Sequence, residues 1–375
     1  MAHAYTPGLR VARCTRVRKR RVLPLEGTVT RAVGDRVAAD DVVAETHLPG
    51  DVHSVNVVNR LGISPGEIER YMCKREGDPV RKGEPIARST ALFGLLKNEV
   101  PSPIDGTVEN VSSVTGQVLL RTAPKPVQVR AFVDGTVVEV EPGEGAVIET
   151  VATFVQGIFG VGRETWGELA VLARAPDEPL DPAAIGPEHA GKLVVGGALV
   201  SYEAIERARE HKVAGVIGGG IHDADLKRLL GYDLGVAITG HEPIGITVVV
   251  TEGFGQIAMA ERTFGLLRER EGARASLSGA TQIRAGVIRP EIIVPYPPGT
   301  EPEVADDEQH EQGVMEIGSI VRCIRRPYFG RIGRVVELPV ELVQVESETR
   351  VRVVEVEFDG ERAVVPRANV ELIEV

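Results

Sequence analysis

Five arginines crowd a short stretch near the end of the chain, and two aromatic residues lie among them. They are Arg322, Arg325, Arg326, Arg331 and Arg334, with Tyr328 and Phe329 in the middle. Arginine contacts the phosphate backbone of RNA, and an aromatic ring stacks on an unpaired base. The pattern predicts contact with RNA or a ribonucleoprotein. Contact with a protein is one alternative, and a solvated strand face balanced by the glutamates of residues 337–361 is another.

Two glycine-rich stretches follow apolar runs and precede helical patterns. The first contains Gly218, Gly219 and Gly220, and the second contains Gly253 and Gly255. Backbone amides at a strand-to-helix junction can hold an anion, and α/β sheets bind ligands at the carboxyl ends of adjacent strands. The stretches therefore suggest an anion or small-ligand site. Tight turns are the alternative, because neither the Walker A nor the Rossmann spacing is present.

The sequence contains no recognisable catalytic motif. His222 and His241 each precede a carboxylate, but adjacent side chains usually point in different directions. No HExxH or GxSxG sequence occurs, and no His/Cys pair has zinc spacing. His47 and His53 flank Asp51 near a turn and form the one weak metal candidate. We predict no catalytic residue, no metal and no cofactor, and favour a binding protein over an enzyme.

A second cationic cluster lies near the N-terminus. It consists of Arg16, Arg18, Lys19, Arg20 and Arg21, which alternate in part with valines. Such a run is typical either of a phosphate-binding patch or of an edge strand protected by charge. The sequence leaves both interpretations open.

The bulk composition limits the classes of protein to consider. The 375 residues carry a net charge of −11 with 43% hydrophobic residues, which indicates a multidomain globular chain and argues against a surface devoted to nucleic acid. No apolar run approaches the roughly 18 residues that span a bilayer, and the N-terminal sequence lacks a secretory core. The odd set Cys14, Cys73 and Cys323 closes no disulfide framework. We expect a cytoplasmic protein without membrane contact.

The elements that must position these residues fall into four segments. Residues 1–175 are Val-rich with turn punctuation and predict β structure, and residues 190–296 alternate strand and helix patterns, which predicts an α/β layer. Residues 297–312 are acidic and proline-rich, as in a linker. Residues 313–375 contain Val- and Arg-rich strands separated by Gly turns.

Short sequence blocks recur within the first segment. The block Gly-Asp-x-Val begins at Gly34 and Gly77, and the block Asp-Gly-Thr-Val begins at Asp105 and Asp134. Glycine permits the positive φ of a tight turn, and the β-branched residues that follow suit a strand. Repetition of this kind predicts pseudo-symmetric β-sheet halves. A short helix capped by Ser64 interrupts the pattern.

Helices are expected at three places in the α/β segment. Ser201 opens one over residues 202–211, Asp223 begins a second that ends at Leu230, and the longest spans Ile257 to Arg270. A strand is expected from Val213 to Ile217, immediately before the first glycine-rich stretch. We recognise no family for this segment.

The C-terminal segment resembles a KOW motif. The stretch GSIVRCIRRPYFGRIGRVVEL matches at positions Gly318, Val321, Pro327, Tyr328, Gly330, Gly333 and Val335. The resemblance covers about the last sixth of the chain. It implies an SH3-like β-barrel, and KOW modules usually bind RNA, ribosomal components or RNA polymerase partners.

The segment from Gly77 to Leu119 resembles a lipoyl- or biotinyl-type barrel-sandwich hybrid. GDPVRKGEPIAR opens it and EVPSPIDGTVENVSSVTGQVL closes it. In that family a lysine on the hairpin between the two parts carries the cofactor. Here the expected position falls near Phe93, and Lys97 is the nearest lysine but lies in an apolar stretch. The resemblance therefore implies an unmodified structural module.

Together these features predict a multidomain adaptor or scaffold without catalytic activity. A barrel-sandwich β domain (1–175), an α/β domain (190–296), an acidic linker (297–312) and a KOW-like barrel (313–375) would make up the chain. The KOW-like module would contact RNA or a ribonucleoprotein, and a protein partner would bind elsewhere. The alternatives are an accessory subunit of a cofactor-dependent enzyme that docks through the lipoyl-like domain, and a ligand-binding α/β protein.

Overall fold

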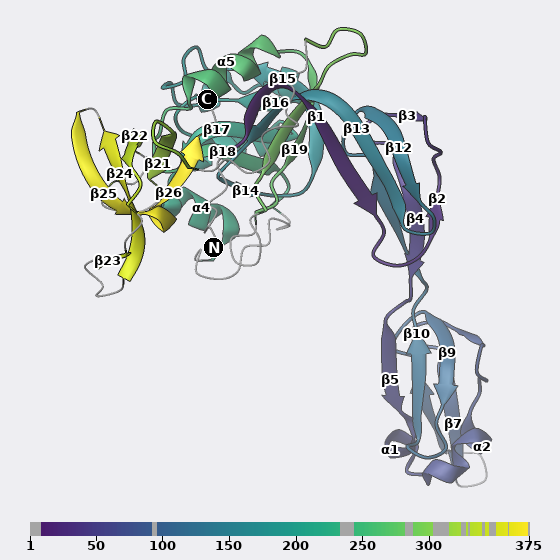
Figure 1. Ribbon diagram of the computed structural model, residues 1–375. Helices are drawn as coiled ribbons and strands as arrows, with labels where there is room; N and C mark the ends of the chain where they lie inside the picture. Colours follow the sequence, from purple (N-terminus) through teal and green to yellow (C-terminus); the bar gives the residue numbers. More distant parts are fainter. Residues whose placement is uncertain are drawn as a thin grey trace.

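The computed structural model describes residues 9–91, 96–232, 244–281, 288–302, 315–323, 328, 331–339, 342–344, 350–358 and 360–373. The described chain is rich in β structure and divides among several sheets. Figure 1 shows an elongated molecule in which long strands lead from an α/β part to a small lobe at the far end.

One mixed sheet of eleven strands connects the N-terminal β structure to the α/β part. Its strand order is β14-β18-β17-β16-β15-β19-β20-β13-β12-β3, with β1 (Val11–Val22) paired to β13 (Gly145–Gln156). The boundary expected between residues 175 and 190 does not separate two sheets. Strand β13 pairs with β20 (Glu291–Pro295), and β15 (Thr165–Val171) pairs with β19 (Arg274–Ser278). One sheet therefore contains strands from both sides of the expected boundary.

The N-terminal end of this sheet and a second, three-stranded sheet form what we call the outer β unit. They surround a core that includes Val43, Phe132, Val137 and Ile148. Besides β1 and β13, the unit contains β2 (Thr28–Val29), β3 (Arg36–Val37), β4 (Val42–Leu48), β11 (Lys125–Arg130) and β12 (Gly135–Glu141).

A second compact unit is inserted into the sequence of the outer one. We call it the inner β lobe because its sequence is enclosed by that of the outer unit. Strands β4 and β11 pair antiparallel with Leu48 opposite Lys125, and the chain between them builds the lobe. The lobe has its own apolar core, which includes Ile68, Ile86 and Leu120. Its elements are β5 (Val52–Asn56), α1 (Val57–Leu61), the 3₁₀ turn Pro65–Glu67, α2 (Ile68–Tyr71), β6 (Pro79–Val80), β7 (Pro85–Ala91), β8 (Leu96–Pro101), β9 (Gly106–Val111) and β10 (Gln117–Arg121). In Figure 1 this lobe lies at the far end of the molecule.

The recurring sequence blocks have the same geometry in both units. In the outer unit the N–H of Gly34 donates to the carbonyl of Val137 at 2.8 Å, and in the inner lobe the N–H of Gly77 donates to that of Val108 at 2.7 Å. Both glycines have positive φ, as their turns require. The repetition in the sequence is therefore a repetition of structure.

The aspartates of the Asp-Gly-Thr-Val blocks also play matching parts. Asp134 Oδ1 accepts the N–H of Ala39 at 2.7 Å, and Asp105 Oδ1 accepts that of Lys82 at 2.8 Å. The hairpin β4–β11 thereby corresponds to the hairpin β7–β8. It follows that the inner lobe is inserted where the outer unit would otherwise have a hairpin tip.

The α/β part contains four parallel strands, β15, β16 (Leu193–Val195), β17 (Gly215–Ile221) and β18 (Thr247–Phe254), with β14 (Phe159–Val161) antiparallel at the edge. Helices α3 (Tyr202–Glu210) and α4 (Asp223–Leu230) share one apolar cluster with the sheet. Helix α5 (Glu261–Glu269) contributes to a separate cluster that contains β19 and β20.

Two of the three predicted helices are confirmed at their N-termini. Ser201 caps α3 by accepting the N–H of Ala204 at 3.2 Å, and α4 begins at Asp223 as expected. Helix α5 starts later than predicted, at Glu261, and the N–H groups of Ile257 and Met259 before it donate to carbonyls of other loops.

The C-terminal β unit comprises β21 (Ile320–Cys323), β22 (Ile332–Glu337), β23 (Leu342–Gln344), β24 (Arg350–Phe358), β25 (Glu361–Pro366) and β26 (Val370–Ile373). The order β26-β21-β22-β24-β25 follows from the strand pairings. Its core includes Val321, Val356 and Phe358. Most of the predicted linker 297–312 lies outside the described residues.

Candidate functional site

The first glycine-rich stretch lies inside a strand and not in a loop. Gly218, Gly219 and Gly220 belong to β17, which runs on to Ile221 instead of ending at Ile217 as predicted, and all three glycines are buried. The N–H of Gly219 donates to the carbonyl of Gly197 at 2.6 Å. That amide is therefore already used within the fold.

Close backbone packing explains these glycines. A Cβ on Gly219 would lie 2.2 Å from the carbonyl oxygen of Ile257, and a Cβ on Gly220 would lie 2.1 Å from that of Gly255. Gly253, in β18, adopts a φ of 133°, which residues with side chains rarely take. The glycines let neighbouring chain segments touch.

The carboxyl ends of the parallel strands are covered by the chain itself. The N–H of Ala198 donates to the carbonyl of Glu178 at 3.0 Å, and the N–H of Met259 donates to that of Pro176 at 3.0 Å. Loops that follow β15, β16 and β18 are thus bonded together over the position where α/β sheets often bind ligands. This arrangement favours the alternative of tight connections over an anion site at the glycines.

The predicted arginine–aromatic cluster is only partly described. Arg325, Arg326 and Phe329 lie outside the described residues, and for Arg322 only the backbone, in β21, is described. Arg334 on β22 is exposed, and its guanidinium donates to the carbonyl of Gly318 at 3.3 Å.

Tyr328 and Arg331 form a stack with the core of the C-terminal unit. The ring of Tyr328 stacks on Phe358 with centroids 5.4 Å apart, and Arg331 lies 4.9 Å from the Phe358 centroid. Arg331 also pairs with Glu361 at 3.2 Å. Both residues therefore support the core, and Arg334 is the described arginine of this cluster that is exposed and contacts only a backbone carbonyl.

Cys323, in β21, is a packing residue. It is 1% exposed within the core of the C-terminal unit. Burial raises the pKa of its thiol to about 11. The thiolate needed for nucleophilic or metal chemistry is therefore strongly disfavoured.

The N-terminal cationic cluster is neutralised by carboxylates of the fold. Arg16 and Arg18 both pair with Glu149, Arg20 pairs with Glu141 and Glu144, Arg21 pairs with Glu164, and Lys19 pairs with Glu291. Among the described strands, β1 pairs only with β13. This geometry favours the charged edge strand over the phosphate patch.

In the weak metal candidate formed by His47, Asp51 and His53, the carboxylate is bonded to a lysine side chain. The carboxylate of Asp51 accepts a hydrogen bond from Lys125 Nζ at 2.6 Å, which lowers the pKa of Asp51. In the part of the chain that the structure describes, no group of three or more His, Cys, Asp and Glu side chains gathers in a way that could hold a metal ion. Nor is any described helix long and apolar enough to cross a membrane.

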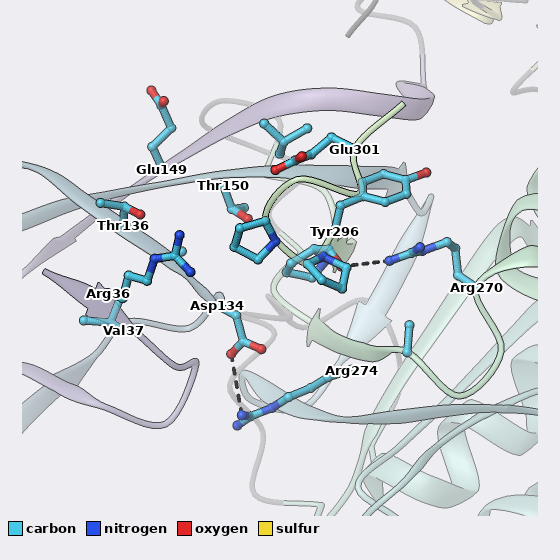
Figure 2. A pocket seen from close by; sticks show the side chains of 16 residues that line it. Arg36, Val37, Asp134, Thr136, Glu149, Thr150, Arg270, Arg274, Tyr296 and Glu301 are labelled. Atoms are coloured by element: carbon cyan, nitrogen blue, oxygen red, sulfur yellow. Dashed lines mark hydrogen bonds and ion pairs between the residues drawn. The ribbon is translucent and has the colours of Figure 1, made fainter. Parts of the chain in front are cut away.

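Sequence reasoning missed a charged cavity of about 620 Å³ at the junction of the outer β unit and the α/β part. Its charged lining consists of Arg36 on β3, Asp134 before β12, Glu149 on β13, Arg270 at the end of α5, Arg274 at the start of β19, and Glu301. Thr136, Thr150, Tyr296 and a run of prolines complete the wall (Figure 2). The residues are far apart in sequence, and no motif links them.

Two carboxylates of this cavity are engaged with arginines. Asp134 lies 3.6 Å from Arg274, which also pairs with Asp40 and lowers the pKa of that carboxyl. Burial alone would raise the pKa of Glu149, but the hydrogen bonds and charges of Arg18 and Arg16 outweigh burial and lower it. Both carboxylates are therefore paired with arginine side chains.

A scan of the chain against protein-family models finds no matching family, and a search of curated proteins finds no matching relative.

Proposed function

We propose that this protein is a non-catalytic multidomain adaptor. Its inner β lobe docks a protein partner, and its C-terminal KOW-like module contacts RNA or a ribonucleoprotein. The observation that carries the proposal is the nested insertion, which holds a lobe with its own core at the end of the outer β unit.

The connection between the two β units supports a docking arm. Two chain segments join them, and the N–H of Thr122 donates to the carbonyl of Asp51 at 3.0 Å between these segments. The N–H of Asp51 donates back to Thr122 Oγ1 at 2.8 Å. Paired segments resist twisting more than a single linker does, so the lobe is presented in a restricted set of orientations.

The inner lobe contains one sheet in the order β5-β10-β9-β6 and a second formed by β7 and β8, an arrangement consistent with a lipoyl-like barrel-sandwich hybrid. Its turns at Gly77 and Asp105 make the same types of hydrogen bond as the turns at Gly34 and Asp134 in the outer unit. A protein that uses such a module without a carrier lysine would use its surface for docking. This role is shared by the adaptor and by an accessory subunit of an enzyme complex.

The C-terminal unit supports assignment to the SH3-like class. Its first strand, β21, pairs with both the second, β22, and the last, β26. A 3₁₀ turn at Arg367–Asn369 separates β25 from β26. KOW modules of this class usually contact RNA or ribonucleoproteins, and exposed Arg334 is suited to a phosphate contact.

Affinity pull-downs from native lysate, with and without nuclease, test the two halves of the proposal separately. One variant ends at Glu311 and lacks the C-terminal unit. A second replaces residues 49–124 with Asn-Gly, a two-residue turn that suits Leu48 and Lys125 directly opposite each other.

The adaptor predicts complementary losses. Truncation at Glu311 abolishes recovery of nuclease-sensitive RNA or ribosomal proteins, and removal of the inner lobe abolishes recovery of a stoichiometric protein partner. Recovery of one protein partner without nucleic acid by the full chain and by the Glu311 variant favours the accessory subunit. Recovery of the same partners by all three proteins refutes both.

A further inference from the structure

We propose that the cavity between the outer β unit and the α/β part binds a small organic molecule carrying a phosphate or carboxylate group. Its volume of about 620 Å³ falls within the range of ligand pockets in proteins. This site is separate from the docking surfaces of the adaptor and does not depend on them.

Arg36 is the first of two cations available to such a ligand. It lies directly opposite Thr136 in the β3–β12 pair, and its neighbour Val37 is buried in the outer core. Because side chains alternate along a strand, Arg36 lies on the opposite face from Val37. Figure 2 shows its guanidinium pointing into the space beside Asp134 and Thr136. Among the described residues no carboxylate pairs with it.

Arg270 is the second cation, and it comes from the other side of the cavity. Its guanidinium lies 4.0 Å from the centroid of Tyr296 and donates to the carbonyl of Pro295 at 2.8 Å. Its Nε is buried without a hydrogen-bond partner among the described residues, and no described carboxylate pairs with the side chain. A buried unpaired donor is costly, which favours binding of an acceptor.

The carboxylates of the cavity do not cancel these two cations. Asp134 is engaged by Arg274 and by the N–H of Ala39, and Glu149 is engaged by Arg16 and Arg18. Glu301 is the remaining carboxylate, and among the described residues no ion pair joins it to Arg36 or Arg270. Figure 2 shows Glu149 and Glu301 on the upper side, away from Arg36.

The rest of the lining indicates the class of ligand. Guanidinium groups recognise phosphate and carboxylate through paired hydrogen bonds, and the hydroxyls of Thr136 and Thr150 can add neutral ones. Tyr296 and its neighbouring prolines offer an apolar wall. The combination fits a small molecule with an oxyanion at one end and an apolar body.

Isothermal titration of the full chain with phenyl phosphate and, separately, with phenylacetate, each of which carries one oxyanion on an apolar body, tests the site at physiological ionic strength. The variants are Arg36→Gln and Arg36→Glu, with Arg262→Gln as the matched control. Arg262 is also an exposed arginine without an ion pair among the described residues, but it lies outside the cavity lining.

We expect saturable binding of at least one probe, and the probe that binds more tightly identifies phosphate or carboxylate as the preferred group. Arg36→Gln should weaken Kd about tenfold, or about 1.4 kcal/mol, Arg36→Glu should weaken it further, and Arg262→Gln should leave it unchanged. The proposal is overturned if neither probe saturates, or if the Arg262 and Arg36 variants lose affinity equally, since that would reflect surface charge alone.

Discussion

Replacing Gly219 with alanine should strongly destabilise the α/β part. The added Cβ would lie 2.2 Å from the carbonyl oxygen of Ile257, 2.8 Å from the amide nitrogen of Met259 and 2.9 Å from the carbonyl oxygen of Gly197. All three are backbone atoms, so no flexible side chain can move aside. Overpacking typically costs 1–3 kcal/mol, and the rigidity of this contact places the expected loss at about 3 kcal/mol or more.

Gly265→Ala is the matched control. Gly265 is exposed within α5, and a Cβ there would meet nothing within 4 Å. Alanine is the better helix former, so this substitution should stabilise the protein by about 0.5–1 kcal/mol. The two variants therefore make the same chemical change with opposite expected signs.

Urea denaturation monitored by Trp166 fluorescence measures both effects. Trp166 is the single tryptophan of the chain, and it lies in β15 of the same sheet as β17. A Gly219→Ala protein with unchanged stability but weakened anion binding would refute the packing argument. It would restore the view that this glycine forms an anion site.

Three further predictions concern other parts of the molecule. At about pH 8 a thiol reagent should label Cys73 quickly and Cys14 and Cys323 slowly. Of the three cysteines only Cys73 is exposed, and burial raises the pKa of the other two thiols. A fast reaction that persists in a Cys73→Ser variant would contradict this prediction. The pKa of Cys323 rises from 9.0 to about 11 on folding, so the thiol ionises at a lower pH in the unfolded chain than in the folded one. The contribution of Cys323 to stability should therefore be intact below pH 9 and fall by about 1 kcal/mol near pH 10. Denaturation of the wild type and of Cys323→Ala as a function of pH measures this loss. Arg331→Ala should lower the stability of the C-terminal unit by about 1 kcal/mol, because the stacking of Arg331 on Phe358 is lost. Arg334→Ala should weaken RNA binding in a salt-dependent assay and leave stability unchanged. Equal effects of the two variants on RNA binding would count against the roles described for these arginines.

Local sequence signals determined much of the secondary structure. Ser201 caps α3 and Asp223 begins α4 because capping and the first helical turn depend on residues within a few positions of each other. The Gly-Asp-x-Val and Asp-Gly-Thr-Val blocks predicted repeated turns for the same reason.

Where a local pattern met a tertiary contact, the contact prevailed. Val213 to Ile217 was predicted as a complete strand, yet β17 continues through three glycines because the loops after β16 and β18 pack against their backbone. The helix expected from Ile257 begins at Glu261, and the segment before it is bonded to other loops. Neither partner segment is adjacent in sequence, so neither effect was predictable locally.

The nesting and the cavity were decided by tertiary structure alone. The sequence contains two copies of each turn block, but only the pairing of Leu48 with Lys125 makes one unit an insertion in the other. The cavity likewise joins Arg36 to Arg270, which are brought together by the pairing of β13 with both β12 and β20. Strand pairing over such separations depends on which apolar faces are buried together, and no short stretch of sequence contains that information.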